Sequence, residues 1–269
     1  MRSGTGRWNE HLATALRCAH SASVAIRQRF GSRDIVTYKG PYDVQLRADL
    51  IAQECIVGEL SSRYPGDSIV AEEGPRATWP DTGHLWAVDP LDGTNNFGYG
   101  VAHCAVAITL FAAQRPVLAL VYDPLLDREF FATEDRVPVH RRPGGVALPQ
   151  ATISLVTDYS ARGRHEGLRI GNLLSNECKR VFTMWAPALD LALVATGGID
   201  AMVCRQAAFL DVCAGMFLVR SHGGRILAPD GVELVPERSL SRRPVTFVAA
   251  RDGVLARRLL DLVNGFEAD

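Results

Sequence analysis

The sequence has no long hydrophobic run and no surplus of charge of either sign. No apolar stretch approaches the roughly 20 residues that a membrane-spanning helix requires, and the first residues contain no apolar signal-peptide core. The 29 lysines and arginines are balanced by 30 aspartates and glutamates, so the chain lacks the basic field that attracts nucleic acid polymers. These absences argue against membrane and nucleic acid partners, and they predict a soluble, cytoplasmic protein.

Paired cysteines are also absent. The six cysteines occur singly, without a C-x-x-C pair or the short Cys/His spacing of a zinc site, so we expect reduced thiols. No Pro/Gly/Ser-rich linker and no internal repeat divides the 269 residues, of which 47% are apolar. A chain of this length and composition can bury a sizeable core, in one large domain or in two intimate halves.

Hydrophobic periodicity predicts a mixture of helices and strands. Apolar residues at spacings of three and four predict helices at 8–30, 46–60, 163–174, 188–196, 210–221 and 254–263. Runs of β-type residues predict strands, in a largely antiparallel sheet, at 68–71, 84–88, 104–111, 117–122, 128–132 and 152–156. Helices and strands in separate layers indicate an α+β fold or a layered α/β sandwich.

Acidic side chains gather at the predicted ends of elements, where they can converge: Asp49, Glu72, Glu73, Asp89, Asp92 and Asp211. The strand at 84–88 is expected to end before Pro90, which has no N–H group for a strand ladder. A tight turn there would aim the carboxylates of Asp89 and Asp92 and the carbonyl of Leu91 at one point, which suits a hard cation. Carboxylates about 4 Å apart repel by roughly 4 kcal/mol at an effective dielectric of about 20, so the cluster requires a compensating cation such as Mg²⁺.

The segment Gly93-Thr94-Asn95-Asn96 predicts a glycine-permitted turn that opens a helical segment. Backbone N–H groups at such a turn bind phosphate. Cations beside an anion-binding turn are typical of metal-assisted hydrolysis of a phosphate ester. Asp211 starts the predicted helix at 210–221, so the alternatives for it are a helix N-cap, a metal ligand or both.

Three segments together resemble the inositol monophosphatase family. They are Glu72-Glu73, the string W-A-V-D-P-L-D-G-T-N-N-F at 86–97, and L-D-V-C-A-G at 210–215 with Gly223-Gly224 beyond it. The resemblance implies a layered αβαβα sandwich of the inositol monophosphatase / fructose-1,6-bisphosphatase type. It also implies one domain over 1–269, with halves at about 1–150 and 151–269, a homodimer, and two or three Mg²⁺ ions.

Roles for individual residues also follow from the resemblance. It implies hydrolysis of a small phosphate monoester by a metal-activated water, and the implied metal ligands are Glu72, Asp89, the carbonyl of Leu91, Asp92 and Asp211. Asp49, Glu72 and Thr94 would be catalytic, with Asp49 and Thr94 orienting the water, while the N–H groups of Gly93 and Thr94 would bind the phosphate. Lys39, in an expected loop before Gly40-Pro41, would lie on the substrate side.

The chain departs from the family where substrates are selected. Trp185-Ala186-Pro187 replaces a small stretch and Cys204 replaces an acidic residue. A separate departure, Gln45-Leu46 in place of Val-Thr before Asp49, removes a hydroxyl near the metal ligands and is expected to shift metal affinity without abolishing it. Trp185 either offers a flat apolar face to a substrate or packs in the core. Inositol, sugar, nucleoside and histidinol phosphates therefore stay open as substrates, the last two in a biosynthetic pathway. A different class of protein, a non-catalytic relative that binds a phosphorylated metabolite, would be expected to have lost a ligand, and none of the implied ligands is lost.

Overall fold

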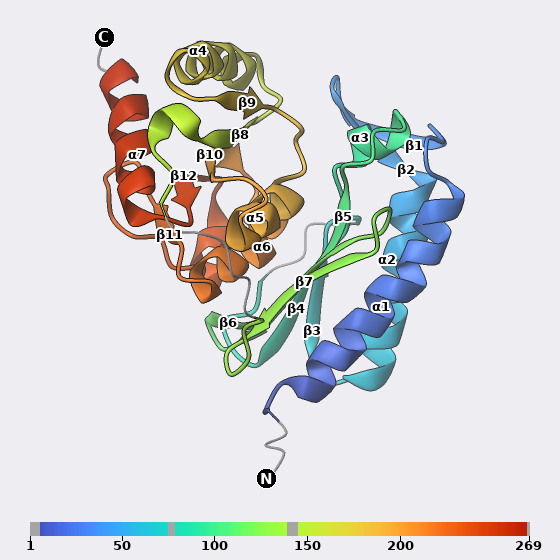
Figure 1. The fold of residues 1–269 in the computed structure, drawn as a ribbon. Coiled ribbons are helices and arrows are strands. Elements are labelled where there is room, and N and C mark those ends of the chain that lie inside the picture. The colour runs from blue at the N-terminus through green and yellow to red at the C-terminus, as the bar shows by residue number, and fades with distance from the viewer. Residues whose placement is uncertain (1–5, 75–78, 139–144, 268–269) are drawn as a thin grey trace. The chain divides into compact units, whose positions relative to one another are not determined.

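The chain divides into two compact units. The computed structural model describes residues 6–74, 79–138 and 145–267 (Figure 1). The first unit contains Met1–Pro138 and Glu237–Ser239, and the second contains Val139–Pro236 and Leu240–Asp269. Across the described ranges, no helix has both the length and the apolar character that a membrane span needs.

The first unit is built on a five-stranded sheet of order β3-β4-β5-β6-β7. β3 and β4 run parallel, and the three following pairs are antiparallel, which confirms the prediction of a largely antiparallel sheet. The predicted strand at 152–156 does not join it, because its partners come later in the chain. The strands are β3 (Ser68–Ala71), β4 (His84–Asp92), β5 (Ala105–Ala112), β6 (Arg115–Asp123) and β7 (Arg128–Thr133).

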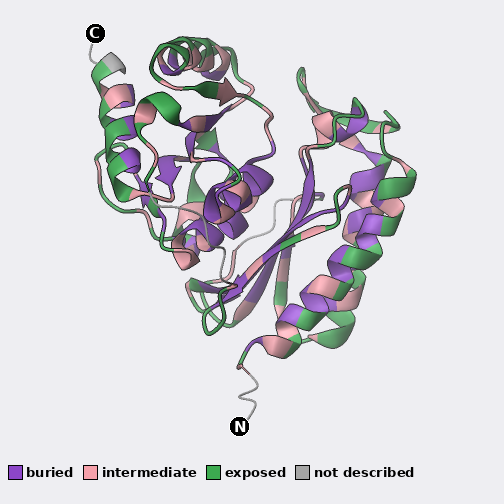
Figure 2. Ribbon diagram, viewed as in Figure 1, coloured by how far each residue is buried: buried purple, intermediate pink, exposed green. Residues whose placement is uncertain are grey.

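Two long helices, α1 (Asn9–Gln28) and α2 (Arg47–Arg63), pack against this sheet and against each other (Figure 1). Apolar residues three and four apart form one stripe on a helix, and that stripe faces the core. Leu12 and Ile26 of α1 share a buried cluster with Ile56 of α2 and with residues of β4, β5 and β6. The outer faces of both helices are largely exposed (Figure 2).

A hairpin of β1 (Ile35–Gly40) and β2 (Asp43–Leu46) precedes α2. The prediction of a loop around Lys39 is wrong, because Lys39 lies within β1. The middle residues of β1 are all exposed, so this strand lacks the alternation of apolar and polar residues by which a half-buried strand is recognised. From this strand Lys39 contacts Glu72 and Glu73, the two residues that follow β3.

The second unit is built on a sheet of order β11-β12-β10-β8-β9. β8 is parallel to β9 and β10, and β12 is antiparallel to both β10 and β11. The strands are β8 (Thr152–Thr157), β9 (Arg180–Phe182), β10 (Ala201–Ala207), β11 (Arg225–Leu227) and β12 (Val245–Ala250). The short 3-10 helix η1 (Leu148–Gln150) lies in this unit, and η2 (Arg238–Arg242) begins in the first unit and ends in the second.

Four helices accompany the second sheet: α4 (Ala161–Glu177), α5 (Pro187–Thr196), α6 (Phe209–Ser221) and α7 (Gly253–Glu267). Val203 of β10 packs in one buried cluster with residues of α4 and α7. Successive side chains of a strand point to opposite faces, so Cys204 lies on the other face, and α5 also contacts β10. Each unit therefore has helices layered on a sheet, as the hydrophobic patterns predict.

Candidate active site

The end of β4 differs from its prediction. The strand was expected to end before Pro90, and this is wrong, since β4 continues to Asp92. Asp89 pairs with Ala107 and Asp92 with Ala105, so β4 has one more residue than β5 between these two pairs. Such a bulge interrupts the ladder and accommodates a residue without an N–H group.

The bulge turns two carboxylates inward at the end of the strand. Asp89 is 3% exposed and Asp92 is 4% exposed. Asp89 Oδ1 accepts a hydrogen bond from the N–H group of Leu91 at 3.0 Å, which fixes the carboxylate against its own turn. Burial of two nearby acidic groups without a cation is unfavourable.

A short helix follows at once, as the sequence predicts. Gly93 is the N-cap residue of α3 (Thr94–Gly98) and has φ of 83°. This left-handed conformation strains residues that carry a Cβ atom, so glycine is required for the turn. N–H groups in the first turn of a helix have no partner within the helix, and at this turn they follow directly on Asp92.

Asp49 and Thr94 form a hydrogen-bonded pair beside this turn. Thr94 Oγ1 lies 2.8 Å from Asp49 Oδ1 and 2.9 Å from the carbonyl oxygen of Leu91. Asp49 Oδ2 accepts the N–H group of Leu46 at 2.8 Å. Leu46 is the N-cap residue of α2 and has no side-chain acceptor of its own, so Asp49 is fixed by capping the helix from its third position.

Burial changes the acidity of Asp49. Its side chain is fully buried, and desolvation raises its pKa from 3.8 to about 7, although the hydrogen bonds from Thr94 and Leu46 oppose the shift. The negative charges of Glu73 and Glu72 add to the increase in the pKa. A carboxyl group that titrates near neutral pH is suited to accepting a proton during a reaction.

Glu72 and Glu73 follow β3 and both contact Lys39. The N–H group of Glu72 donates to the carbonyl of Val88 at 3.1 Å, which extends the pairing of β3 with β4. Lys39 Nζ lies 2.6 Å from Glu72 Oε1 and 2.7 Å from Glu73 Oε1. Burial alone would lower the pKa of Lys39, but the two carboxylates outweigh it and raise the pKa above its usual value.

Two glutamines that were not predicted as site residues hold Glu73. Gln45 donates to Glu73 Oε2. Gln53 accepts the N–H group of Glu73 at 2.9 Å and donates to its carbonyl oxygen. Gln53 follows Asp49 by four positions on α2 and therefore shares its helix face, which is a signal by which it could have been found.

The remaining predicted residues belong to the second unit. Asp211 lies in the first turn of α6, and because the N-cap residue is Ala208, the N-cap alternative for Asp211 is wrong. Cys204 is fully buried, and desolvation raises the pKa of its thiol to about 12. Trp185 has φ of 50° and is half-buried, and its ring meets the ring of Tyr159 edge to face at 4.0 Å.

The oxygen donors of the first unit have the chemistry of a magnesium site. Within the described parts of the chain, no group of three or more His, Cys, Asp or Glu side chains is arranged to hold a metal ion. The ammonium group of Lys39 instead neutralises Glu72 and Glu73. Carboxylates and a main-chain carbonyl are hard donors of the type that Mg²⁺ prefers, so the oxygen atoms of Glu72, Asp89, Leu91 and Asp92 match this ion in chemical type, although they are not gathered around one point.

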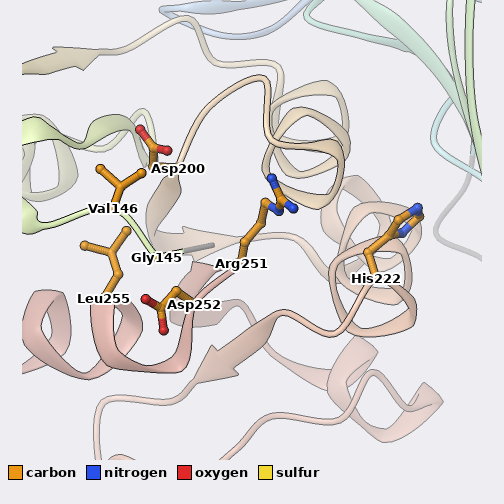
Figure 3. Close-up of a pocket in the computed structure, with 7 residues that line it drawn as sticks. All are labelled: Gly145, Val146, Asp200, His222, Arg251, Asp252 and Leu255. Carbon is orange, nitrogen blue, oxygen red and sulfur yellow. The ribbon is translucent and has the colours of Figure 1, made fainter. Parts of the chain in front are cut away.

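A separate cavity of about 100 Å³ lies within the second unit (Figure 3). No residue implicated by the sequence in metal, phosphate or substrate binding lines this cavity. Its lining comes from the segments before η1, before β10, after α6 and after β12, and from α7: Gly145, Val146, Asp200, His222, Arg251, Asp252 and Leu255.

The layered fold, the acidic strand ends and the hydrogen-bonded Asp49–Thr94 pair together point to the phosphoric monoester hydrolases. The model of the inositol monophosphatase family matches residues 8–264. The chain therefore belongs to the inositol monophosphatase family, and with it to the phosphoric monoester hydrolases, as the sequence motifs predict.

Individual relatives agree with this assignment. An inositol-1-monophosphatase of Rhizobium meliloti is 35% identical over 199 residues, covering 70% of this chain and 73% of the relative. The Nus factor SuhB of Escherichia coli is 31% identical over 221 residues, covering 79% and 83%. The solved IMPase of Thermotoga maritima has a TM-score of 0.83 at 22% identity and covers 96% of this chain and 98% of that one, which confirms the predicted sandwich fold.

Proposed function

We propose that this protein hydrolyses a small phosphate monoester in a Mg²⁺-dependent reaction, by direct attack of water on phosphorus. The observation that carries the proposal is the contact of Thr94 Oγ1 with both Asp49 and the carbonyl of Leu91, beside two buried carboxylates. This arrangement joins a proton acceptor of raised pKa to a group that can orient a water molecule.

Two or three Mg²⁺ ions would be held by Glu72, Asp89, the carbonyl of Leu91, Asp92 and Asp211. When bound, such ions lower the pKa of a coordinated water and neutralise charge on the phosphate. All the proposed donors except Asp211 come from the ends of two neighbouring strands of the first unit, β3 and β4. Asp211 is the one proposed Mg²⁺ ligand that belongs to the second unit.

The chain's own residues supply the remaining steps. Thr94 Oγ1 orients the attacking water and accepts a hydrogen bond from it. The hydroxyl proton of Thr94 passes to Asp49 across the 2.8 Å contact as the water gives its proton to Thr94. The N–H groups of Gly93 and Thr94 hold the phosphate oxygens at the start of α3. Capping of α2 by Asp49 keeps the acceptor in position before substrate arrives, which is the preorganisation that such catalysis requires.

The first substrate to test is an inositol phosphate, because the relative from Rhizobium meliloti is named inositol-1-monophosphatase. The half-buried ring of Trp185, packed on Tyr159, favours in addition a substrate with a flat apolar face. Nucleoside monophosphates have such a face, and histidinol phosphate carries an aromatic ring, whereas simple sugar phosphates have neither. The preference between these substrates is assigned to Trp185, Cys204 and Lys39.

A second candidate function is non-catalytic. Several relatives are named Nus factor SuhB, and a role like theirs, or binding of a phosphorylated metabolite without turnover, would not need the Asp49–Thr94 pair.

We also propose that the two units form one domain, and that the protein is a cytoplasmic homodimer. Sedimentation at several concentrations tests the dimer.

The deciding experiment is phosphate release from inositol, nucleoside, sugar and histidinol monophosphates, with Mg²⁺ and with EDTA in its place. Turnover is expected with Mg²⁺ only, and it is expected to be lost in Asp89→Asn. Asp230→Asn, a change at an exposed residue of the second unit, is the matched control and should retain activity. Equal release with EDTA would refute the metal-dependent mechanism, and binding without release from any substrate would favour the non-catalytic candidate.

A further inference from the structure

The two adjacent acidic residues after β3 have different surroundings. The side chain of Glu73 is 1% exposed, whereas that of Glu72 is 28% exposed. Both oxygens of Glu73 are used, one by Lys39 and the other by Gln45. Its main chain is held on both sides by Gln53. Glu73 is therefore a buried carboxylate fixed by several hydrogen bonds, and Glu72 is the more exposed of the two carboxylates.

Lys39 connects the two. Its ammonium group sits 2.7 Å from the anchored Glu73 and 2.6 Å from Glu72. A positive charge in contact with Glu72 opposes a divalent cation at the same carboxylate, because like charges a few ångströms apart repel strongly at low dielectric. A cation bound at Glu72 would therefore compete with Lys39, whose second contact is to Glu73 and does not involve Glu72.

We propose that Lys39 is an internal counter-ion that occupies Glu72 until a divalent cation displaces it, and that Glu73 is the positioning residue that retains Lys39 nearby. The inference rests on the proposed function, because it takes Glu72 to be a metal ligand. It assigns to the β1–β2 hairpin, which carries Lys39, a direct influence on the metal concentration at which the site fills.

Calorimetric titration of the whole protein with Mg²⁺ alone tests this competition. Lys39→Met is expected to tighten Mg²⁺ binding about threefold to fivefold, as removal of one modest ion pair predicts. Lys39→Arg keeps the charge and is expected to bind like the natural protein. Arg47→Met removes a charge from an exposed residue at the start of α2 and should leave the dissociation constant unchanged, which separates direct competition from a general change in charge.

A second readout uses the rarity of lysine in this chain. Lysine occurs only at positions 39 and 179, and Lys179 is exposed. An amine held between two carboxylates reacts slowly with an acylating reagent. Saturating Mg²⁺ is therefore expected to increase acylation of Lys39, measured by peptide mass spectrometry, with no change at Lys179.

The outcomes separate this inference from the proposed function. If the natural protein binds no Mg²⁺, both are overturned. If it binds Mg²⁺ but Lys39→Met binds it equally or more weakly, or if Mg²⁺ leaves acylation of Lys39 unchanged, the counter-ion role alone is refuted. Equal tightening in Lys39→Met and Arg47→Met would also refute it, because the effect would then not depend on contact with Glu72.

Discussion

The residues assigned to the proposed function are distributed differently in the two units. In the first unit, Leu91 and Thr94 belong to one short stretch of sequence at the end of β4 and the start of α3, and Thr94 also contacts Asp49 of α2. In the second unit, Trp185, Cys204 and Asp211 come from a turn, a strand and a helix that are separate in the sequence. Most of the residues assigned to the reaction thus come from the stretch 89–94, whereas the residues assigned to substrate preference are dispersed.

This difference explains why one part of the function was easier to infer than the other. A contiguous string such as D-P-L-D-G-T fixes spacing and backbone geometry together, so that one turn can bring several functional groups into register. Dispersed residues converge only through packing of the complete unit. The comparison predicts that substitutions of Asp49 and of residues 89–94 abolish turnover of every substrate, while substitution of Trp185 changes the ranking of substrates.

The largest expected effect is that of Asp49→Asn. Asparagine keeps an oxygen that can cap Leu46, but it cannot accept a proton, so kcat is expected to fall by about 10² to 10⁴ for all substrates. The rates of phosphate release and the thermal unfolding curve measure this. A uniform loss of rate with a retained unfolding transition supports a catalytic role. A loss confined to one substrate would instead show that Asp49 affects substrate preference, which the comparison assigns to other residues.

The next effect is a pH dependence of stability in the metal-free protein. Desolvation raises the pKa of Asp49 from 3.8 to about 7 in the folded state. Between these values the folded chain binds the proton more readily than the unfolded chain does. The contribution of Asp49 to the free energy of unfolding is therefore fully present below pH 3.8 and is lost as the pH rises towards 7, by at most about 1.4 kcal/mol per pH unit.

Denaturant titrations in EDTA at pH 4, 5.5 and 7 measure this contribution. The control is Asp49→Asn, which has no titrating group at this position and should lack the corresponding slope. Subtraction of the two curves removes the contributions of all other groups that titrate equally in both proteins. Parallel curves would show that Asp49 has an ordinary pKa, and the assignment of a near-neutral proton acceptor to the first unit would then fail.

The fold was predictable where periodicity is strong. The helices α1 and α2 were expected from apolar residues that the structure places in one buried cluster. The hairpin β1–β2 was not, because its exposed residues carry no alternating pattern. The strand at 152–156 was recognised as a strand but assigned to the wrong sheet, because its partners β9 and β10 pair with it across long separations.

The candidate site shows the same limit. Acidic residues were expected at the ends of strands, and Gly93 was expected at a turn that opens a helix. The passage of β4 through Pro90 could not be predicted, because the bulge depends on the partner strand β5. The contacts of Lys39 with Glu72 and Glu73 could not be predicted from the sequence either, since they join residues more than 30 positions apart.

The smallest expected effect comes from Trp185→Gly in the second unit. Trp185 has φ of 50°, a conformation that glycine adopts without strain, so the substitution is expected to preserve the turn. Loss of the ring removes its edge-to-face contact with Tyr159 and an apolar surface. We expect the ratio of kcat/KM between a nucleoside monophosphate and inositol phosphate to fall about tenfold, which is typical of a lost apolar contact.

The control for this change is Tyr159→Phe, which keeps the aromatic contact and should leave the ratio unaltered. Because Trp185 is assigned to substrate preference alone, the Mg²⁺ requirement should be the same in the natural protein and in Trp185→Gly. An unchanged ratio would assign Trp185 to packing within the second unit. An equal loss of rate on every substrate would instead show that Trp185 takes part in the reaction itself. Its assignment to substrate preference alone would then be refuted.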